Sequence, residues 1–414
     1  MKRHRIRVGV VGAGRGLTFA RQAPAAGMEL AAVCDTWKER LEEAGADLGV
    51  ATYSNYDAFL EHDMDAVILA NYFHEHAPFA VKALEMGFHV MSECSACHTL
   101  GEGVALARAV EKCGRIYMFA ENYPYMVYNQ EMRRLFQEGV IGDFLYGEGE
   151  YVHPDSARVH TARSVGMDHW RNWIPATYYC THSLAPIMYI TGTRPVKVNG
   201  FIVPYDHNDP SMTEYVRVSD TAAAIMLRMD NGAVVKSLHG NLRGHQNYVR
   251  IHGNKGMMEN ARIGKNKNAL RVHLAPHGRE QAEHEERVYA PKFPHHPREA
   301  ANAGHGGGDF FTNYEFAEAI RTGTQPYLDV YKAIDMSIAG ILAYRSALAE
   351  GAPVSVPDFR NEEVRKQFEH DAWSPDPRRA GPGQPFPSIL GRIEPSEEAV
   401  RFSRQVWAEQ GYRE

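Results

Sequence analysis

The chain has 414 residues, a formal net charge of −6 at neutral pH and no long basic run, so its composition does not favour a nucleic-acid partner. No apolar stretch approaches the roughly 18–20 residues that cross a bilayer, and five cysteines, an odd number in a long chain, argue against a disulfide framework. We therefore expect a cytoplasmic protein that makes no membrane contact, and the length predicts two domains.

A βαβ unit is predicted at the start of the chain, over residues 6–35. Residues 6–11 are nearly all apolar, which is typical of a strand buried on both faces of a parallel sheet. Gly12, Gly14, Arg15 and Gly16 follow without a break, and a helix is expected over residues 17–26. Such a glycine turn lets backbone amides approach a pyrophosphate at the helix N-terminus. Because the turn reads G-x-G-x-G, a tight turn without a ligand is the alternative.

Asp35 follows a second apolar run, residues 30–34, and lies 21 residues after Gly14. A carboxylate at that distance is where a dinucleotide fold binds the adenosine ribose, and it repels the 2′-phosphate of NADP. The sequence therefore predicts NAD as the cofactor, while Lys38 and Arg40 leave NADP as an alternative.

Strands and helices continue to alternate as far as residue 120. Helices are predicted over residues 38–48, 56–62, 76–86 and 103–113, and strands over residues 65–70, 88–92 and 116–120. Alternation over this length implies right-handed crossovers and one parallel, doubly wound sheet of the Rossmann type.

From residue 144 the pattern changes to strands joined by hairpin turns. Strands are predicted over residues 144–153, 196–203, 222–229, 233–240, 248–253 and 257–260. They indicate an α+β domain with a large, mostly antiparallel sheet, one face packed on helices and the other free for a partner subunit. We therefore expect a homo-oligomer formed through this sheet. Further helices are predicted over residues 309–322, 330–350 and 396–409.

These elements divide the chain into three predicted parts. Residues 1–122 are expected to form the NAD-binding Rossmann domain and residues 123–352 the substrate-binding domain. Residues 353–414 are rich in proline and are expected to wrap the domain or a partner subunit.

Several longer segments carry a family resemblance when they are taken together. They are the glycine turn, AVCD ending at Asp35, DAVILANYFHEHAPFAVKALEMGFHV with His76, and GHGGGDFF followed by DVYKAIDMS. Over residues 5–355 the chain resembles the glucose–fructose oxidoreductase/inositol dehydrogenase (Gfo/Idh/MocA) family. The resemblance implies bound NAD, a small sugar substrate and a cofactor contact at each of these positions: Gly12, Gly14, Arg15, Gly16, Asp35, Arg40, Asn71, His76, Glu93, Cys94 and Asn122.

Two departures from the pattern of the family dehydrogenases concern the expected proton transfers. Those enzymes carry Glu-Lys-Pro after the strand at residues 88–92, with the lysine beside the nicotinamide, whereas this chain has Glu93-Cys94-Ser95. They also carry Asp-x-Gly-x-His, where this chain has Tyr178-Tyr179-Cys180-Thr181-His182. The histidine is kept, while the lysine and the aspartate are both absent.

The same region carries motifs of a second kind. Glu121-Asn122 follows the last predicted parallel strand, Glu148-Gly149-Glu150-Tyr151-Val152-His153 lies on a later strand, and Trp170-Arg171 precedes Tyr179-Cys180-Thr181-His182. These motifs resemble the NAD-dependent α-N-acetylgalactosaminidase-type glycosidases within the family. The resemblance implies a redox-neutral cleavage in which hydride leaves C3 of the sugar and later returns, with a catalytic group made of these residues: Glu121, Tyr151, Arg171, Tyr179 and His182.

Other interpretations remain open on the sequence. A plain NAD(P)-dependent sugar or inositol dehydrogenase is the first alternative, and an NAD-binding sensor without catalysis is the second. The pattern Cys94-Ser95-Ala96-Cys97-His98 spells a haem attachment motif, but it would occupy the nicotinamide crevice. We expect no metal, with a site built from Cys94, Cys180, His153 or His182 as the alternative. His305, among glycines, is either a loop residue or a sugar contact.

Overall fold

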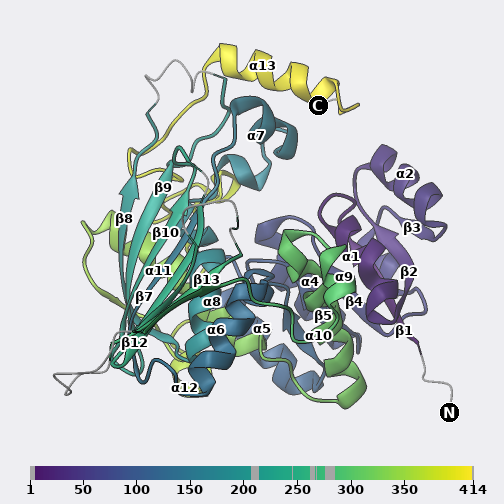
Figure 1. Cartoon of the computed structure of the whole chain (residues 1–414). Helices are drawn as coiled ribbons and strands as arrows, with labels where there is room; N and C mark the ends of the chain where they lie inside the picture. The colour runs from purple at the N-terminus through teal and green to yellow at the C-terminus, as the bar shows by residue number, and fades with distance from the viewer. Residues whose placement is uncertain are drawn as a thin grey trace.

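Two β-sheets, each covered by helices, stand side by side in the computed structural model (Figure 1). The structure describes residues 5–206, 214–244, 246–261, 266, 268–275 and 285–412. Among these residues, no helix combines the length and the apolar character that crossing a bilayer requires.

The first sheet has six strands, all parallel, in the order β3-β2-β1-β4-β5-β6. Its strands are β1 (Ile6–Val11), β2 (Met28–Cys34), β3 (Ala51–Tyr53), β4 (Ala66–Leu69), β5 (His89–Ser92) and β6 (Tyr117–Phe119). All four residues of β4 are fully buried, as expected for a strand covered on both faces. The predicted parallel, doubly wound sheet is confirmed. The edge strand β3 was missed, because three partly exposed residues are too few to show a period.

The helices that cover this sheet are α1 (Gly16–Gln22), α2 (Lys38–Leu48), α3 (Tyr56–Leu60), α4 (His76–Glu85) and α5 (Leu100–Cys113). The helix predicted over residues 17–26 ends at Gln22 and continues as a 3₁₀ turn, Ala23–Ala26, because Pro24 has no N–H to donate along an α-helix. Helix α5 begins three residues before its predicted start. The side chain of Thr99 accepts a hydrogen bond from the backbone N–H of Glu102 and caps it.

The second sheet has nine strands in the order β14-β13-β12-β11-β7-β10-β9-β8-β15. Their bounds are β7 (Phe144–Val152), β8 (Pro195–Val203), β9 (Ala222–Met229), β10 (Val234–Gly240), β11 (Gln246–Gly253), β12 (Gly256–Asn260), β13 (Leu270–Leu274), β14 (Glu285–Tyr289) and β15 (Val354–Ser355). Among the described strands of this second sheet, only β7 and β10 pair in parallel, so the predicted, mostly antiparallel sheet is confirmed. Strands β13, β14 and β15 were not predicted.

Helices α8 (Thr181–Thr191) and α11 (Val330–Leu348) cover one face of the second sheet. Glycines in the strands permit this close contact. A Cβ atom on Gly149 of β7 would overlap the carbonyl oxygen of Ser183, and one on Gly200 of β8 would overlap that of Ala343. Helix α6 (Val127–Gln137), which was not predicted, packs against α8. The close approach fixes the N-terminal end of α8, and with it His182, beside β7.

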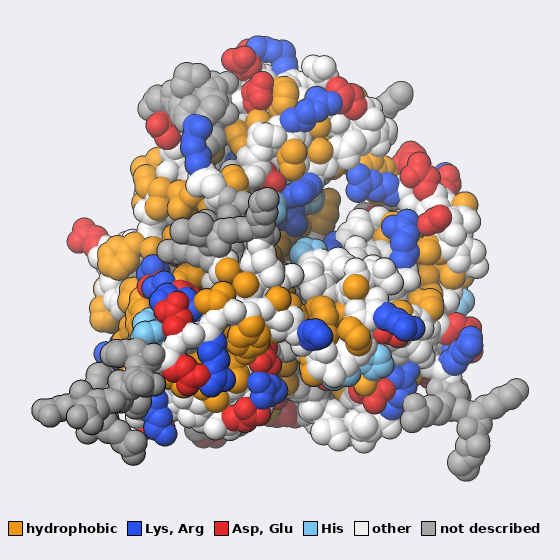
Figure 2. Space-filling model, viewed as in Figure 1, with side chains coloured by type: hydrophobic (Ala, Val, Ile, Leu, Met, Phe, Trp, Pro, Cys, Tyr) orange, Lys and Arg blue, Asp and Glu red, His pale blue; other side chains and the backbone are white. Residues whose placement is uncertain are grey.

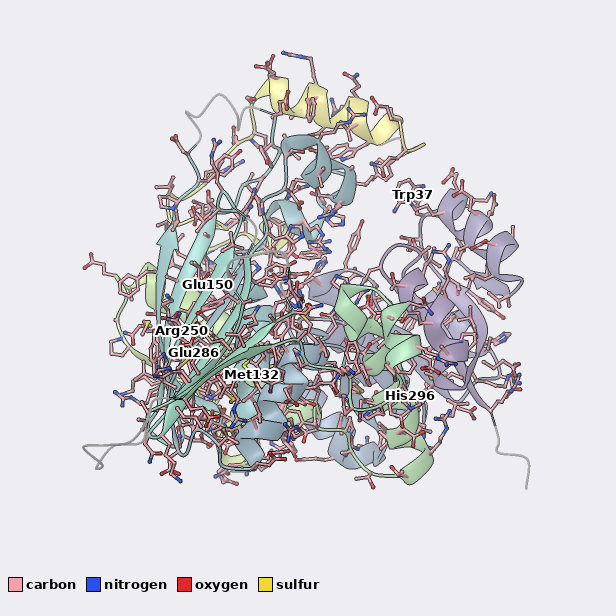
Figure 3. The ribbon with its side chains drawn as sticks, viewed as in Figure 1. Trp37, Met132, Glu150, Arg250, Glu286 and His296 are labelled. Carbon is pink, nitrogen blue, oxygen red and sulfur yellow. The ribbon has the colours of Figure 1, made fainter. Side chains whose placement is uncertain are left out.

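The opposite face of this sheet carries a ladder of complementary charges (Figure 3, where Glu150, Arg250 and Glu286 are labelled). Lys236 lies 3.5 Å from Glu148, and Arg250 lies 2.7 Å from Glu259. The ladder continues through Arg271 to Glu286 at 2.9 Å. None of the described helices has its main contacts with this face, which carries paired charges together with exposed apolar side chains such as Phe201.

Helix α10 (Gly308–Thr322) returns to the first half of the chain and packs on α1, where the side chain of Asn313 donates to the carbonyl of Phe19, and α9 (Pro297–Ala301) packs on α10. The tail adds β15 to the edge of the second sheet and continues through α12 (Glu362–Arg365) to α13 (Glu397–Ala408), which packs on α7 (Ala157–Arg163) (Figure 1). The three predicted parts thus interlock, and their bounds stay a prediction.

Candidate active site

A cavity of about 1110 Å³ is lined by residues from both sheets and from the C-terminal segment. In Figure 2 the molecular surface is hollowed between the two halves, and Lys, Arg and His side chains gather on the wall of the hollow. One side consists of loops that follow strands of the parallel sheet, which is where open α/β sheets bind ligands. The other side comes from β7, β10, α8 and the turns before α8.

The glycine turn is shaped for close approach by a ligand. Gly12 has a φ of +105°, and a Cβ atom there would overlap the carbonyl oxygen of Ala70. A Cβ atom on Gly14 would meet nothing within 4 Å, so the backbone lies open to the cavity. A Cβ atom on Gly16 would lie 2.8 Å from Cγ1 of Val10, so this glycine permits tight helix–strand packing instead.

Asp35 lies at the rim of the cavity, directly after β2. Its Oδ2 accepts a hydrogen bond from Ala13 N at 2.5 Å, and its Oδ1 accepts one from Trp37 N at 2.7 Å. The carboxylate is thereby held against the glycine turn, as a ribose-binding acid must be. Since each oxygen keeps a further acceptor position, the turn and Asp35 together fit NAD.

The Arg40 side chain is engaged by two other side chains of the protein. Its guanidinium stacks over the Trp37 ring at 3.9 Å and donates to Oε1 of Gln410 at 2.8 Å. The C-terminal segment therefore holds Arg40, and the Tyr412 ring lies 5.4 Å from Trp37 on the same rim (Figure 3 labels Trp37).

Arg15 is the centre of a buried charge network. Its Nε donates to Glu93 at 2.6 Å, and its two terminal nitrogens donate to both oxygens of Asp309, at 2.6 and 3.0 Å. Asp309 also accepts from Asn122 at 2.8 Å and from His305 Nδ1 at 2.8 Å. Burial raises the pKa of the Glu93 carboxyl, but Arg15 outweighs burial and holds that pKa below its usual range. The network ties the turn to α10, so Arg15 is oriented before any ligand binds.

Asn71 and His76 line the cavity next to this network. The His76 ring is buried between two carbonyls, that of Ser95 at 2.9 Å from Nδ1 and that of Asn71 at 3.3 Å from Nε2. Burial lowers the pKa of His76, so the ring is neutral and links the loop after β4 to the loop after β5. Its contact with a cofactor stays a prediction.

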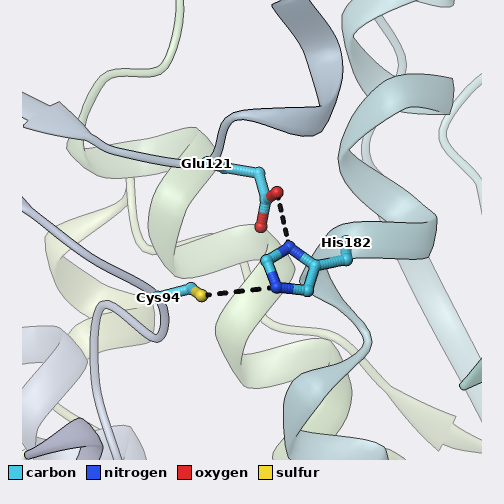
Figure 4. Close-up of side chains that lie close together, drawn as sticks. All are labelled: Cys94, Glu121 and His182. Atoms are coloured by element: carbon cyan, nitrogen blue, oxygen red, sulfur yellow. Dashed lines mark hydrogen bonds and ion pairs between the residues drawn. The ribbon is translucent and has the colours of Figure 1, made fainter. Parts of the chain in front are cut away.

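His182, Glu121 and Cys94 meet at the floor of the cavity, although 88 residues separate the first from the last (Figure 4). Nδ1 of His182 lies 2.7 Å from Oε1 of the fully buried Glu121, and Nε2 lies 4.0 Å from Sγ of Cys94. Because a carboxylate only accepts hydrogen bonds, the contact with Glu121 places a proton on Nδ1 and leaves Nε2 as the ring nitrogen that faces the Cys94 loop. Glu121 thus orients His182 as a base that faces the Cys94 loop.

Three tyrosine rings surround the His182 ring, those of Tyr123, Tyr151 and Tyr179, with centroids 4.7, 4.7 and 4.8 Å away. Burial raises the pKa of Tyr151 to about 12 and that of Tyr179 well above its usual value. The positive charge of Arg171 favours the phenolate and so lowers both pKa values, but burial raises them by more. Both hydroxyls are therefore protonated at neutral pH and act as hydrogen-bond donors.

Of the four residues that were considered as metal ligands, two come together and two lie apart. Cys94 and His182 present ligand atoms within 4.8 Å of one another and of Glu121. Cys180 Sγ instead donates to the carbonyl of Met336 at 3.8 Å, and His153 lies 3.5 Å from Asp155. All five cysteines are free, and Cys94 and Cys97 are buried, so the haem-like pattern offers no exposed pair of thiols, although Cys94 lines the cavity.

Comparison with known proteins agrees with this geometry. Residues 6–121 match the family model of the oxidoreductase family with an NAD-binding Rossmann fold, named Gfo/Idh/MocA, and residues 191–366 match the glycosyl hydrolase 109 C-terminal domain. The two matches are to the Rossmann domain of the Gfo/Idh/MocA family and to the C-terminal domain of its glycosyl hydrolase 109 members, which confirms both parts of the resemblance.

Named members of the Gfo/Idh/MocA family are similar along most of the chain. A glycosyl hydrolase family 109 protein of Saccharopolyspora erythraea is 27% identical over 397 residues, covering 86% of this chain and 83% of its own. A Bacteroides fragilis member is 25% identical over 401 residues, with 86% and 85% covered. A levoglucosan dehydrogenase structure with NADH and L-sorbose superposes with a TM-score of 0.73 at 22% identity, covering 86% of this chain and all of the other, and shows the same fold.

Several residues of the site were not predicted: Asp309 and Tyr123 contact residues that line the cavity, and His239 and Tyr412 line it themselves. Asp309 lies in the GHGGGDFF segment, but its partner Arg15 is 294 residues away, so no local pattern joins them. Tyr123 follows Glu121-Asn122 directly, and that adjacency is a signal that could have found it. His239 occupies a buried position on β10, where a histidine among apolar residues is itself a signal. The sequence contains no signal that would place Tyr412 at the cavity.

Proposed function

We propose that this NAD-dependent enzyme cleaves a glycosidic bond of a sugar by elimination and addition, with no net oxidation. The family assignment makes the chain an NAD-dependent enzyme that acts on sugars. The glycosyl hydrolase 109 C-terminal domain and the relatives of that name support the cleavage. The observation that carries the proposal is the Glu121–His182 pair beneath two protonated tyrosines.

The reaction needs a base, hydrogen-bond donors and a fixed nicotinamide. NAD held at the glycine turn and Asp35 would supply reversible hydride transfer at C3 of the sugar. Two protons also move on the way to the enone: the O3 hydroxyl proton as the C3 alcohol becomes a ketone, and then the C2 proton next to that ketone. Nε2 of His182 accepts the O3 proton and passes it to solvent, then removes the C2 proton and gives it to the departing C1 oxygen, and Nδ1–H to Glu121 at 2.7 Å stabilises the positive ring each time. Water then adds to C1 of the enone, a proton returns to C2, and O3 regains a proton from solvent as hydride returns to C3.

Tyr151 and Tyr179 donate rather than accept in this scheme. Their raised pKa values keep the hydroxyls protonated, so they hydrogen-bond to oxygens on which negative charge develops. Arg171 stacks over Trp170 at 4.3 Å and lies 5.9 Å from the Tyr179 ring, where it favours that charge. The Glu93–Arg15–Asp309 network holds the turn and the Cys94 loop in place beside them.

Turnover of an aryl glycoside in D₂O with catalytic NAD⁺ tests the proposal. We expect deuterium at C2 of the released sugar, retention of a C3 deuterium label, and no accumulation of NADH. His182→Gln and Tyr179→Phe should suppress both exchange and release. Stoichiometric NADH with an intact glycosidic bond would identify a plain dehydrogenase, and NAD⁺ binding without any turnover of sugars would identify a sensor.

We also propose that the protein is cytoplasmic and forms a homo-oligomer through the second sheet. The face with the charge ladder is left uncovered by the described helices, which supports a subunit contact there. Light scattering on the purified protein would give the subunit number, and a monomer at micromolar concentration would contradict the oligomer. Fractionation of the producing cells would test the location.

A further inference from the structure

The wall of the cavity opposite the glycine turn carries an excess of positive charge. Arg163, Arg171 and Arg217 line it, whereas Asp155 is the one carboxylate among the described residues on this side. Both oxygens of Asp155 lie 3.0 Å from Arg163, and His153 lies 3.5 Å from one of them. Asp155 is therefore already neutralised, and the charges of the other two arginines remain.

Arg171 and Arg217 come from different segments that are bound together. The backbone N–H of Val218 donates to the carbonyl of Asn172 at 2.7 Å, which places the two arginine-bearing turns next to each other. Neither guanidinium forms an ion pair with a carboxylate of the described residues. Arg217 donates only to neutral oxygens, Ser219 Oγ at 3.0 Å and the carbonyl of Asp220. Two cations thus face one cavity with no carboxylate of the described chain paired to either. Burial lowers the pKa of Arg217 and outweighs the buried Asp220, which acts on Arg217 and favours its charged form, so the arrangement is costly.

His239 supplies a second and independent observation at the same place. It is 9% exposed, lines the cavity, and makes no hydrogen bond of normal geometry on either ring nitrogen, although the backbone of Ala176 lies close enough to act on its pKa. It pairs across the sheet with Tyr151, and the two rings stack at 5.2 Å with planes 4° apart. A buried, oriented polar ring with so little internal pairing points to a ligand in the cavity.

The positive charge of Arg217 also lowers the pKa values of the neighbouring histidines. Burial first, and then His182 and Arg217, lower the pKa of His239 well below its usual value. Burial and Arg217 lower the pKa of His160 to about 3. Both rings are therefore neutral at pH 7, and the positive charge of this wall resides on the arginines.

We propose that the sugar substrate carries an anionic group, a carboxylate, sulfate or phosphate ester, which Arg217 and Arg171 bind while His239 donates a hydrogen bond to it. The inference rests on the proposed function for the sugar itself and adds its chemical class. Planar guanidinium groups bind such oxyanions through paired, charge-assisted hydrogen bonds. Neutral hydroxyls would accept the same hydrogen bonds but would leave both cations uncompensated.

Binding and turnover of matched sugars test this inference on the NAD⁺-loaded protein. The probes are 4-nitrophenyl hexosides that differ at C6 only: a neutral hydroxymethyl, a carboxylate, a sulfate and a phosphate. Tryptophan fluorescence gives their dissociation constants, and we expect one anionic probe to bind at least 10-fold more tightly than the neutral one. That preference should decrease when salt is raised, because the contact is between charges. Comparing the three anions identifies the group.

Arg217→Gln should reduce the preference for the anionic probe at least 10-fold, toward a ratio of one. Arg228→Gln on β9, an exposed arginine that donates to the carbonyl of Gly232, is the matched control and should keep the full preference. Arg217→Lys keeps the charge but loses the paired geometry, so it should retain part of the preference if Arg217→Gln fails to fold. Equal affinity of the native protein for all four probes would overturn the inference.

The test of anion binding and the test of glycosidic cleavage can give different answers. An anionic sugar that binds through Arg217 but is only oxidised, with stoichiometric NADH, would uphold this inference and refute the cleavage. Cleavage of neutral and anionic glycosides at equal rates, with exchange at C2, would uphold the cleavage and refute this inference.

Discussion

Replacing Glu121 by glutamine should slow turnover about 5- to 30-fold and leave the fold intact. Glu121 is fully buried, its Oε1 lies 2.7 Å from Nδ1 of His182, and its Oε2 has no hydrogen-bond partner. Glutamine has the same shape and still accepts through its carbonyl oxygen. The substitution therefore removes the charge and little else.

The magnitude follows from the kind of hydrogen bond that remains. A hydrogen bond to a charged group contributes about 1.5–3 kcal/mol and a neutral one about 0.5–1.5 kcal/mol. The difference, about 1–2 kcal/mol, is lost when the His182 ring becomes positive during proton transfer. At about 1.4 kcal/mol for each factor of ten, this corresponds to the 5- to 30-fold decrease.

Initial rates on an accepted glycoside, together with C2 exchange in D₂O, measure the effect. Glu138→Gln, at the exposed C-cap position that follows α6, is the control and should keep the native rate. In a His182→Gln background the Glu121 substitution should cost almost nothing more, because the two residues act as a unit. An equal decrease in both backgrounds would show that Glu121 does not act through His182.

Four further outcomes are expected. Asp35→Ala should weaken NAD⁺ binding about 10- to 100-fold by the loss of charge-assisted hydrogen bonds, and a titration of the native protein that shows tighter NADP⁺ than NAD⁺ would contradict this. Cys94→Ser should keep the fold and part of the activity, and stoichiometric metal in the native protein that this variant lacks would refute the metal-free site. Tyr151→Phe should slow C2 exchange, whereas full exchange would restrict Tyr151 to packing. Burial lowers the pKa of His74 to about 4 and that of His98 to about 3; since the unfolded chain then binds more protons, the melting temperature should fall as pH decreases from about 6.5 to 4, and the double variant His74→Gln, His98→Gln should flatten this dependence.

Local pattern was sufficient where one stretch of chain contains the whole signal. The turn at Gly12, the strand before it and Asp35 all fall within 30 residues, and the structure has them as expected. The central strands of both sheets were also predicted, because burial on one or both faces imposes a period. Short edge strands such as β3 and β14 impose none, since partly exposed residues can be of any type.

The site was only partly predictable for a different reason. A family motif placed Glu121 and His182 in one group, but the 2.7 Å contact between them depends on how α8 approaches β7 through Gly149. The partner of Arg15 and the neighbours of Arg217 arrive from segments far along the chain. The raised pKa values of the tyrosines likewise depend on burial, which no motif reports.

Residues 407–412 complete the rim of the cofactor cleft. Trp407 donates to the carbonyl of Thr161 at 3.0 Å, Gln410 accepts from Arg40 at 2.8 Å, and Tyr412 lies against Trp37. Residue 40 leaves the ribosome about 370 residues before residue 412, on the order of 20–70 s earlier at about 5–20 residues per second. During that time the glycine turn and Asp35 exist without this wall. The dinucleotide therefore has its widest access before residues 407–412 emerge, and the docking of these residues closes that side of the cleft.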